Sequence, residues 1–417
     1  MRKAATVAVV SVAALLATAG CGGGGPRGGG ESKLTDDKIV LGVLNDQTAV
    51  YSALSGRNSV KAVEMAIADF KAKYGDKAVT QNITVESADH QNKPDVANSK
   101  AAEMYDRKGV DALLDVPTSS AALKVAEVAA AKKKLYFNVS AATTELTGKA
   151  CNKYTFHYAY DTYMLANGTG TTATQKGAKR WYIVYPNYAF GQDMEKSFSA
   201  AIEKAGGAVV AREPTPFPNN TGDYSVQLLK ATTLNPKPDT LGVMQAGADL
   251  VNVVKQYNEF KLRDKGLNLA VGLMFITDIH SLTPDALAGT TFTEAWYWNF
   301  DDRNRAFADK FMQQTGVRPT FAHAANYSAA TQYLEAVQAA GTDDADKIVE
   351  SMEGKTIDDL FLRNGKVRAE DHRVVHDAYL ARVKPSAQVG QAWDYEEIVS
   401  TIPAAEAFRT PSPDCKL

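Results

Sequence analysis

Short apolar segments alternate with amphipathic segments along most of this 417-residue chain. The first apolar segment, Ile39–Leu44, is typical of a buried strand, and the stretch after it places Val60, Val63 and Ile67 on one face of a helix. A strict alternation of strand and helix produces parallel sheets with helices on both faces, because successive parallel strands are joined by crossover connections. This pattern constrains the fold more than any other feature, and it predicts an α/β protein.

The alternation occurs in two series. The strands expected in the first series are Ile39–Leu44, Ile83–Ser87, Val110–Val116 and Leu135–Val139, and those in the second are Arg180–Tyr185, Ala208–Arg212, Thr240–Met244 and Leu269–Ile276. A chain of this length is too long for one compact core, so the two series predict two Rossmann-like lobes.

The last third differs from both series. It holds an expected strand at Thr291–Asn299, helices near residues 302–315, 323–340 and 344–353, a hairpin-like stretch at Leu360–Val383 and a strand at Tyr395–Ser400. Late helices without strands of their own suggest a segment that returns to the first lobe, through hinge crossovers. The expected boundaries are 1–20 for a signal peptide, 21–36 for a flexible linker, 37–157 plus 295–358 for the N-terminal lobe, 158–294 plus 359–402 for the C-terminal lobe, and 403–417 for a tail.

The chain opens with the features of a secretion signal. Arg2 and Lys3 form a charged region, residues 4–17 form an apolar region that is short for a membrane span, and small residues lead to Cys21. A cysteine there, followed by glycines, resembles a bacterial lipoprotein signal, although Thr18 stands where that pattern usually has leucine. We expect lipidation of Cys21 and an extracytoplasmic protein that is lipid-anchored to the cell membrane. An ordinary signal with a chance cysteine is the alternative.

Two cysteines remain after Cys21. In an oxidising compartment a pair of cysteines usually closes into a disulfide, so we expect Cys151 to bond to Cys415. Such a bond would hold the C-terminal tail on a loop far back in the chain. Two free, buried thiols are the alternative.

Composition and motifs argue against several function classes. Lys and Arg (46) nearly balance Asp and Glu (48), so the chain lacks the basic excess typical of nucleic-acid or polybasic membrane binding. The loose dinucleotide pattern of Gly168–Ala173 precedes an expected strand instead of following one, so we interpret it as helical. The histidines are scattered, and Asp278 with His280 offers only a partial pair for catalysis. We therefore expect no enzyme activity, no metal and no cofactor.

Polar residues follow several expected strands, at the sheet edge where ligands bind in open α/β folds. Ser119, Ser120 and Thr143 stand at the start of helical segments, where hydroxyl and backbone N–H groups could hold a carboxylate. Ordinary helix capping is the alternative.

The second series offers different candidates. Asp278 follows the expected strand Leu269–Ile276 and could meet a cationic group, although capping of the next turn is the alternative. Tyr188 also follows a strand and could stack on a ligand, with Tyr51 as a weaker candidate of the same kind. We interpret Trp296–Trp298 as alternating burial within a strand instead of a site.

Several segments together resemble an extracellular solute-binding protein of the type I periplasmic-binding fold, in the branched-chain amino-acid (leucine/isoleucine/valine) binding family that serves ABC importers. The resemblance runs from about residue 37 to residue 415. The matching segments are Ile39–Asp46 with Leu54–Gly56, Ser87–Pro94, Asp115–Ser120, Val139–Thr147, Tyr188–Asp193 and Phe275–Asp278.

The resemblance implies a cleft in which a small ligand is held between two lobes joined by hinge strands. It places the ligand carboxylate on Ser119 or Ser120, Ala141 and Thr143, the cleft tyrosine at Tyr188, and the partner of a ligand ammonium at Asp278. A second tyrosine of the amino-acid binders falls near Ala246 and Gly247, where this chain has none, which puts an aliphatic amino acid in doubt and leaves Gly247 as a cleft candidate.

The function implied is capture of an amino acid or an aromatic or other small carboxylate for an ABC permease and ATPase complex. A ligand-sensing receptor component of the same fold is the alternative. We expect a monomer that binds no nucleic acid.

Overall fold

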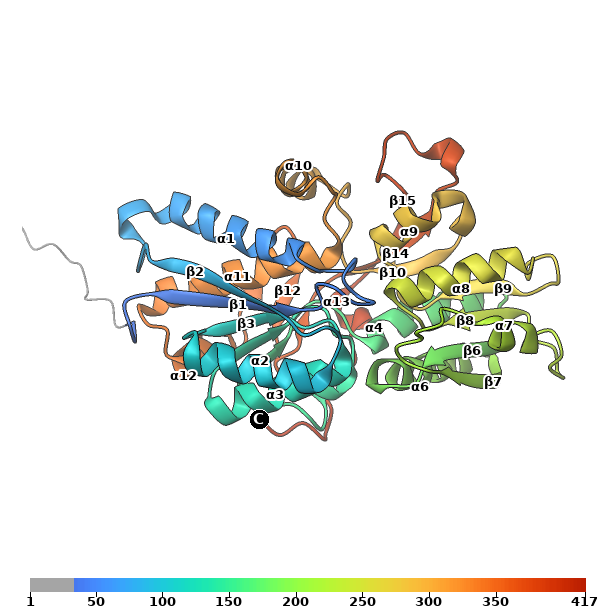
Figure 1. Cartoon of the computed structure of the whole chain (residues 1–417), viewed down its shortest axis with the longest axis horizontal. Coiled ribbons are helices and arrows are strands. Elements are labelled where there is room, and N and C mark those ends of the chain that lie inside the picture. Colours follow the sequence, from blue (N-terminus) through green and yellow to red (C-terminus); the bar gives the residue numbers. More distant parts are fainter. Residues whose placement is uncertain (1–33) are drawn as a thin grey trace, which may run out of the picture. The chain divides into compact units, whose positions relative to one another are not determined.

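The computed structural model describes residues 34–417 (Figure 1). The predicted signal peptide (1–20), the lipidation site Cys21 and most of the predicted linker lie outside the described residues. Within the described part, two lobes each contain a parallel sheet flanked by helices. This architecture is the α/β fold that the alternating pattern predicts.

The first lobe is built on a five-stranded sheet whose strands are all parallel, in the order β2-β1-β3-β4-β5. Its strands are β1 (Ile39–Asn45), β2 (Ile83–Asp89), β3 (Ala112–Asp115), β4 (Leu135–Asn138) and β5 (Thr155–His157). The helices between them are α1 (Asn58–Tyr74), α2 (Pro94–Arg107) and α3 (Ser119–Lys132).

Side chains of β1 alternate between the two faces of this sheet, as expected for a strand buried on both sides. Leu41 and Val43 pack into the larger hydrophobic core, together with residues of α1 and of the late helix α11 (Phe321–Ala340). Val40 and Leu44 pack into a second core formed with α2 and α3. Helices therefore cover both faces of the sheet, and α11 completes one of them.

The second lobe is built on a four-stranded parallel sheet in the order β7-β6-β8-β9. Its strands are β6 (Arg180–Pro186), β7 (Ala208–Thr215), β8 (Thr240–Val243) and β9 (Asn268–Val271). Its helices are α4 (Thr162–Leu165), a π-helical turn (Ala166–Gly170), α5 (Thr171–Gln175), α6 (Ala189–Lys204), α7 (Ser225–Lys230), α8 (Gly247–Glu259) and α9 (Ile276–Leu282). The dinucleotide-like pattern of Gly168–Ala173 is thus helical, as predicted.

The remaining segments follow helix α9 in the chain. Antiparallel strands β10 (Thr291–Glu294), β14 (Ala378–Val383) and β15 (Glu396–Ile402) form one small sheet, and β11 (Thr356–Ile357), β12 (Gly365–Val367) and β13 (Val374–Val375) form another. Helices α10 (Asp302–Thr315), α11 and α12 (Ala345–Met352) lie between them in sequence, and α13 (Ala404–Ala407) follows. A disulfide joins Cys151 of the first lobe to Cys415, so the C-terminal tail is bound to that lobe as predicted.

Two predicted strands end well before their predicted last residues. Strand β9 ends at Val271, and Ile276 begins helix α9, so Asp278 lies in the first turn of a helix instead of at a strand end. Strand β10 ends at Glu294, and Trp296, Tyr297 and Trp298 are all buried, which contradicts alternating burial. The two indoles donate to backbone carbonyls, of Leu360 and Trp393 respectively, so irregular backbone can hold the cluster without a strand.

Candidate ligand-binding site

The carboxyl ends of the strands in the two lobes meet at a closed interface. The hydroxyl of Tyr51, in the loop after β1, lies 2.6 Å from that of Tyr188, at the start of α6. The backbone N–H of Ala248 donates to the carbonyl of Val50 over 3.2 Å. The two lobes therefore touch through side chains and through backbone.

Gly247 allows this close approach. Its φ of +58° lies in the left-handed region, and a Cβ at this position would lie 2.5 Å from the carbonyl oxygen of Val50. A larger residue would collide with the opposite lobe or separate the two. The absence of a side chain at Gly247 thus lets the two lobes come into contact at this point.

A narrow space remains between the lobes. The gaps between its atoms total about 200 Å³, but nearly all of this is too narrow for a water molecule, and the part wide enough holds about one. It is lined by Tyr51, Leu54, Pro117, Ser140, Tyr160, Tyr188, Phe190, Ala246 and Leu273. Of the predicted site residues, Tyr51 and Tyr188 line this space directly.

A wider opening lies at the rim of the same interface. It measures about 1040 Å³, counting space open to solvent, and both lobes contribute to its walls. Asp249 of the second lobe lies there, and burial raises the pKa of its carboxyl to about 6.

The second lobe presents mainly aromatic and aliphatic side chains to the interface. The ring of Phe217 stacks on that of Tyr188 with 3.9 Å between centroids, and it lies 5.7 Å from the ring of Tyr51. Phe190 packs against Tyr188 from another direction, at 6.0 Å. Together these rings form an aromatic wall.

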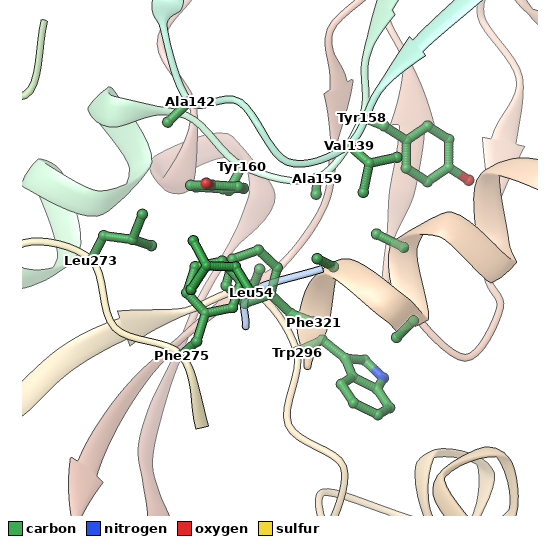
Figure 2. Packing of buried hydrophobic residues seen from close by; sticks show 14 of the residues in the cluster. Leu54, Val139, Ala142, Tyr158, Ala159, Tyr160, Leu273, Phe275, Trp296 and Phe321 are labelled. Carbon is green, nitrogen blue, oxygen red and sulfur yellow. The ribbon is translucent and has the colours of Figure 1, made fainter. Parts of the chain in front are cut away.

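An apolar seam continues this wall toward the connecting segments (Figure 2). Phe275 of the second lobe stacks on Phe321 of the first lobe at 4.3 Å, and Tyr160 meets Phe321 edge-on at 4.9 Å. Leu54 and Leu273 lie beside these rings (Figure 2). The interface is thus sealed from this side by hydrophobic contact.

The first lobe presents a buried polar network instead. The carboxylate of Asp115, at the end of β3, accepts hydrogen bonds from Ser140 Oγ and from Asn45 Nδ2, the latter over 3.0 Å. Burial raises the pKa of Asp115, while these hydrogen bonds oppose the rise. The network fixes the loops that follow β3 and β4 relative to each other.

The backbone at the end of β3 is strained. Asp115 has φ +84° and Val116 has φ +63°, a region that β-branched residues rarely adopt. Such conformations cost about 1–3 kcal/mol each and persist where the surrounding structure imposes them, often at binding sites. The strain lies directly before Pro117 and Thr118, which lead into α3 at Ser119.

Several hydrogen-bond donors beyond these strand ends have no partner within residues 34–417. Ser119 Oγ and Thr118 Oγ1 are buried and unpartnered. The backbone N–H groups of Ala141, Ala142 and Thr143 make no hydrogen bond to any described residue. Because β3 and β4 are neighbouring parallel strands, these donors follow adjacent strands at one edge of the sheet.

The other predicted residues of the first lobe have structural partners or partial exposure. Thr143 Oγ1 accepts from the N–H of Glu145 over 3.3 Å, so its hydroxyl caps a short helical turn. The carbonyl of Ala141 accepts from His157 Nε2 and from Asn138 Nδ2. Ser120 is half-buried in the first turn of α3.

Asp278 does not line the narrow space between the lobes. Its Oδ2 accepts from the N–H of Phe275 over 2.9 Å and thereby caps α9. Complete burial raises the pKa of this carboxyl to about 7. The neighbouring His280 contacts the hydroxyl of Tyr395 and stacks on Trp393.

The predicted site residues leave out several that line or flank the space, above all Ser140, Tyr160 and Phe217. Ser140 follows a strand, as Ala141 and Thr143 do, but the resemblance gives it no role in holding the ligand. Tyr160 and Phe217 lie in irregular connections, where no periodic pattern places a side chain.

Two further observations concern the described residues alone. Within residues 34–417, no helix combines the length and the apolarity that a membrane span requires. In the same range, no three His, Cys, Asp or Glu residues gather as a metal ion would need.

Two α/β lobes that meet over a small space, with polar donors on one side and aromatic rings on the other, define a two-lobe solute-binding protein. The chain belongs to the periplasmic binding protein family, whose model matches residues 38–388. Membership of this family places the protein outside the cytoplasm.

Solved structures agree with this assignment. A periplasmic binding protein from Burkholderia mallei is 39% identical, with 90% of this chain and 97% of that chain covered and a TM-score of 0.85. A branched-chain amino-acid ABC transporter periplasmic ligand-binding protein from Burkholderia xenovorans LB400 is 34% identical, with 91% and 100% covered and a TM-score of 0.79.

A solute-binding protein of an ABC transporter from Rhodopseudomonas palustris BisB5, in complex with 3,4-dihydroxybenzoic acid, is 21% identical, with 88% of this chain and 98% of that chain covered and a TM-score of 0.77. This likeness concerns the fold alone. No curated protein matches the chain.

Proposed function

We propose that the protein is the substrate-binding lipoprotein of an ABC transporter and has no enzymatic activity. It captures a small carboxylate-bearing solute, an amino acid or an aromatic acid, between its lobes and delivers it to a permease. The proposed ligand residues are those named from the sequence: Ser119, Ser120, Ala141, Thr143, Tyr188, Asp278, Tyr51 and Gly247.

The unpartnered donors of the first lobe carry this proposal. Buried backbone N–H groups almost always have a hydrogen-bond partner, and those of Ala141, Ala142 and Thr143 have none in the described chain. Ser119 Oγ, also buried and unpartnered, belongs to the neighbouring strand end. A carboxylate has several lone pairs and forms strong, charge-assisted hydrogen bonds, so it suits such a set of donors.

The aromatic wall supports an apolar, flat body for the ligand. Tyr188 and Phe217 stack on each other, and an aromatic ring could take the same kind of contact. Ala246 lines the space, near the position to which the resemblance assigns a second tyrosine of the amino-acid binders. An alanine side chain there occupies less of the cleft than a tyrosine would. The complex of the Rhodopseudomonas palustris protein with 3,4-dihydroxybenzoic acid makes an aromatic acid a reasonable first candidate.

Ligand entry requires the lobes to separate, because the closed space is smaller than any such solute. We infer that the lobes rotate about the connecting strands, and that the ligand shifts the population toward the closed form by binding it better. The permease would then recognise the closed form. The proposed lobes are residues 37–157 with 295–358 and residues 158–294 with 359–402, with lipidation at Cys21 as the membrane anchor.

Isothermal titration calorimetry tests the ligand class. Benzoate, 4-hydroxybenzoate and leucine would be compared with benzamide, which keeps the ring of benzoate and removes its charge. We expect a carboxylate to bind and benzamide to bind at least about tenfold more weakly, which corresponds to one charge-assisted hydrogen bond. Binding of benzamide equal to benzoate, or no binding of any carboxylate, would contradict the proposal.

The anchor has a separate test. Mass spectrometry of the protein from membranes of a host with lipoprotein processing should find a lipid on Cys21. A Cys21→Ala variant should carry no lipid at this position. An unmodified Cys21 in the unaltered protein would refute lipidation without affecting the ligand assignment.

A further inference from the structure

A second cavity lies away from the space between the strand ends, and the two share no lining residue. It measures about 690 Å³, counting space open to solvent. Its walls come from the segment spanning α4 to α5, from α6, from Thr144 of the first lobe and from Arg409 of the C-terminal tail. Both lobes and the tail therefore contribute to it.

The floor of this cavity is apolar. Ala166, Ala200 and Ala201 line it, and the ring of Tyr163 adds an aromatic surface. Small-molecule sites are typically concave, mostly apolar and equipped with a few polar groups. The cavity is concave and its exposed lining is mostly apolar, and polar groups stand around it.

The polar groups around the cavity are unbalanced in charge. Three cationic side chains line it, those of Lys196, Lys204 and Arg409. None of the three makes an ion pair with a residue in the range 34–417. The one acid in the lining, Asp193, is already engaged by hydrogen bonds.

Asp193 is used by neighbouring donors. Its Oδ2 accepts from the N–H of Thr144 over 2.6 Å and from Thr162 Oγ1 over 2.7 Å, and its Oδ1 accepts from Thr144 Oγ1 over 3.0 Å. The carboxylate thus joins the two lobes, and within residues 34–417 it forms no ion pair with Lys196 or Lys204.

Arg409 is held in place beside the cavity. Its Nη2 donates to the carbonyl of Thr144 over 2.7 Å, and its own carbonyl accepts from Arg368 Nη1 over 2.5 Å. The Nε of Arg409 is buried and has no hydrogen-bond partner within the described residues. The Cys151–Cys415 disulfide anchors the tail a few residues further on. A fixed guanidinium with a donor to spare is a suitable anchor for an anionic group.

We infer that this cavity is a second binding site, which takes a small organic anion with an apolar body. Its carboxylate or sulfonate group lies among Lys196, Lys204 and Arg409, and its apolar body rests on the alanines and on Tyr163. This site is independent of the ligand proposed for the cleft.

Fluorescence titration with 1-anilinonaphthalene-8-sulfonate, an aromatic sulfonate, tests the site on the purified full chain. Lys196→Gln combined with Lys204→Gln should raise the Kd at least tenfold. Ala200→Trp should abolish binding, because residue 200 is exposed on α6 and its new side chain would fill the cavity. Lys176→Gln removes an exposed lysine outside the lining and should change nothing.

A cleft variant separates this site from the proposed function. Ser119→Ala with Tyr188→Leu should leave the binding of this probe unchanged, whatever it does to benzoate. Loss of probe binding in the cleft variant with retention in both cavity variants would overturn the inference. Absence of probe binding to the unaltered protein, or equal loss with Lys176→Gln, would also overturn it.

Discussion

The two faces of the interlobe site are chemically different. The first lobe supplies hydroxyls, backbone N–H groups and the buried carboxylate of Asp115, whereas the second supplies Tyr188, Phe217, Phe190 and Leu273. The difference follows from the loops after the strands. Hydrogen bonds and backbone strain shape the loop after β3, and hydrophobic packing shapes those of the second lobe. A ligand held between them needs a polar end and an apolar end.

The disulfide gives the largest expected difference between the lobes. Changing Cys151 and Cys415 to Ser should lower the free energy of unfolding by roughly 4–5 kcal/mol, because a loop of 264 residues would no longer be closed in the unfolded chain. Hydrogen exchange should detect the loss mainly in the first lobe and the tail. Equal loosening of β6 and β8 would show that the lobes unfold as one unit.

Asp278 tests whether the buried part of the second lobe carries no charge, as its apolar side chains suggest. Burial raises the pKa of this carboxyl from 3.8 to about 7, so between these pH values the folded protein binds a proton that the unfolded chain releases. The free energy of unfolding should therefore fall as pH rises through this window, by on the order of 4 kcal/mol.

Asp278→Asn should flatten that pH dependence, as measured by denaturant unfolding at pH 5 and pH 8. The exposed Asp264→Asn serves as the control and should keep the slope. An unchanged slope in Asp278→Asn would indicate a charged carboxylate, and the second lobe would then be able to receive an ammonium group.

Gly247 tests the contact between the two faces. Gly247→Ala places a Cβ against the carbonyl of Val50 and should hold the lobes apart, which weakens ligand binding by about 3 kcal/mol, roughly a hundredfold in Kd. Gly266→Ala is a matched control, because Gly266 also has a positive φ (+83°) but no atom within 4 Å of its added Cβ. Equal affinities of the two variants would refute the requirement for this close approach.

Single substitutions on the two faces of the cleft should have the smallest effects on affinity, and they test each face separately. Ser119→Ala should weaken benzoate and an aliphatic carboxylate alike, by about tenfold, because it removes a hydrogen bond to the shared charged group. Tyr188→Leu should weaken benzoate by about fivefold and leave the aliphatic acid unchanged, since ring contacts are worth about 1 kcal/mol. Titration calorimetry measures both. If both variants weakened benzoate and the aliphatic acid in the same ratio, the first lobe would not be binding the charged group and the second lobe the ring.

The sequence predicted the fold better than the details of the site. Apolar runs such as Ile39–Leu44 alternate regularly with amphipathic segments, so they placed the strands and the edge where ligands bind. Tyr51 and Tyr188, named from their positions after strands, do line the space between the lobes.

Irregular backbone accounts for the errors and omissions. Strand β9 stops at Val271 because Gly272 and the residues after it turn the chain into α9, which the continuous apolar run concealed. Phe217 reaches Tyr188 from a loop whose path depends on tertiary packing. The N–H groups of Ala141, Ala142 and Thr143 have no partner in the described chain because of the path of the loop after β4, which no sequence pattern gives.

Because of the bond between Cys151 and Cys415, a probe at the carboxyl terminus follows the motion of the first lobe. Leu417 lies two residues beyond a crosslink to the first lobe, so a dye attached there travels with that lobe. A second dye on Val226 of α7, whose side chain is 72% exposed, would travel with the other. Energy transfer between the two dyes would therefore measure the opening and closing of the lobes in solution.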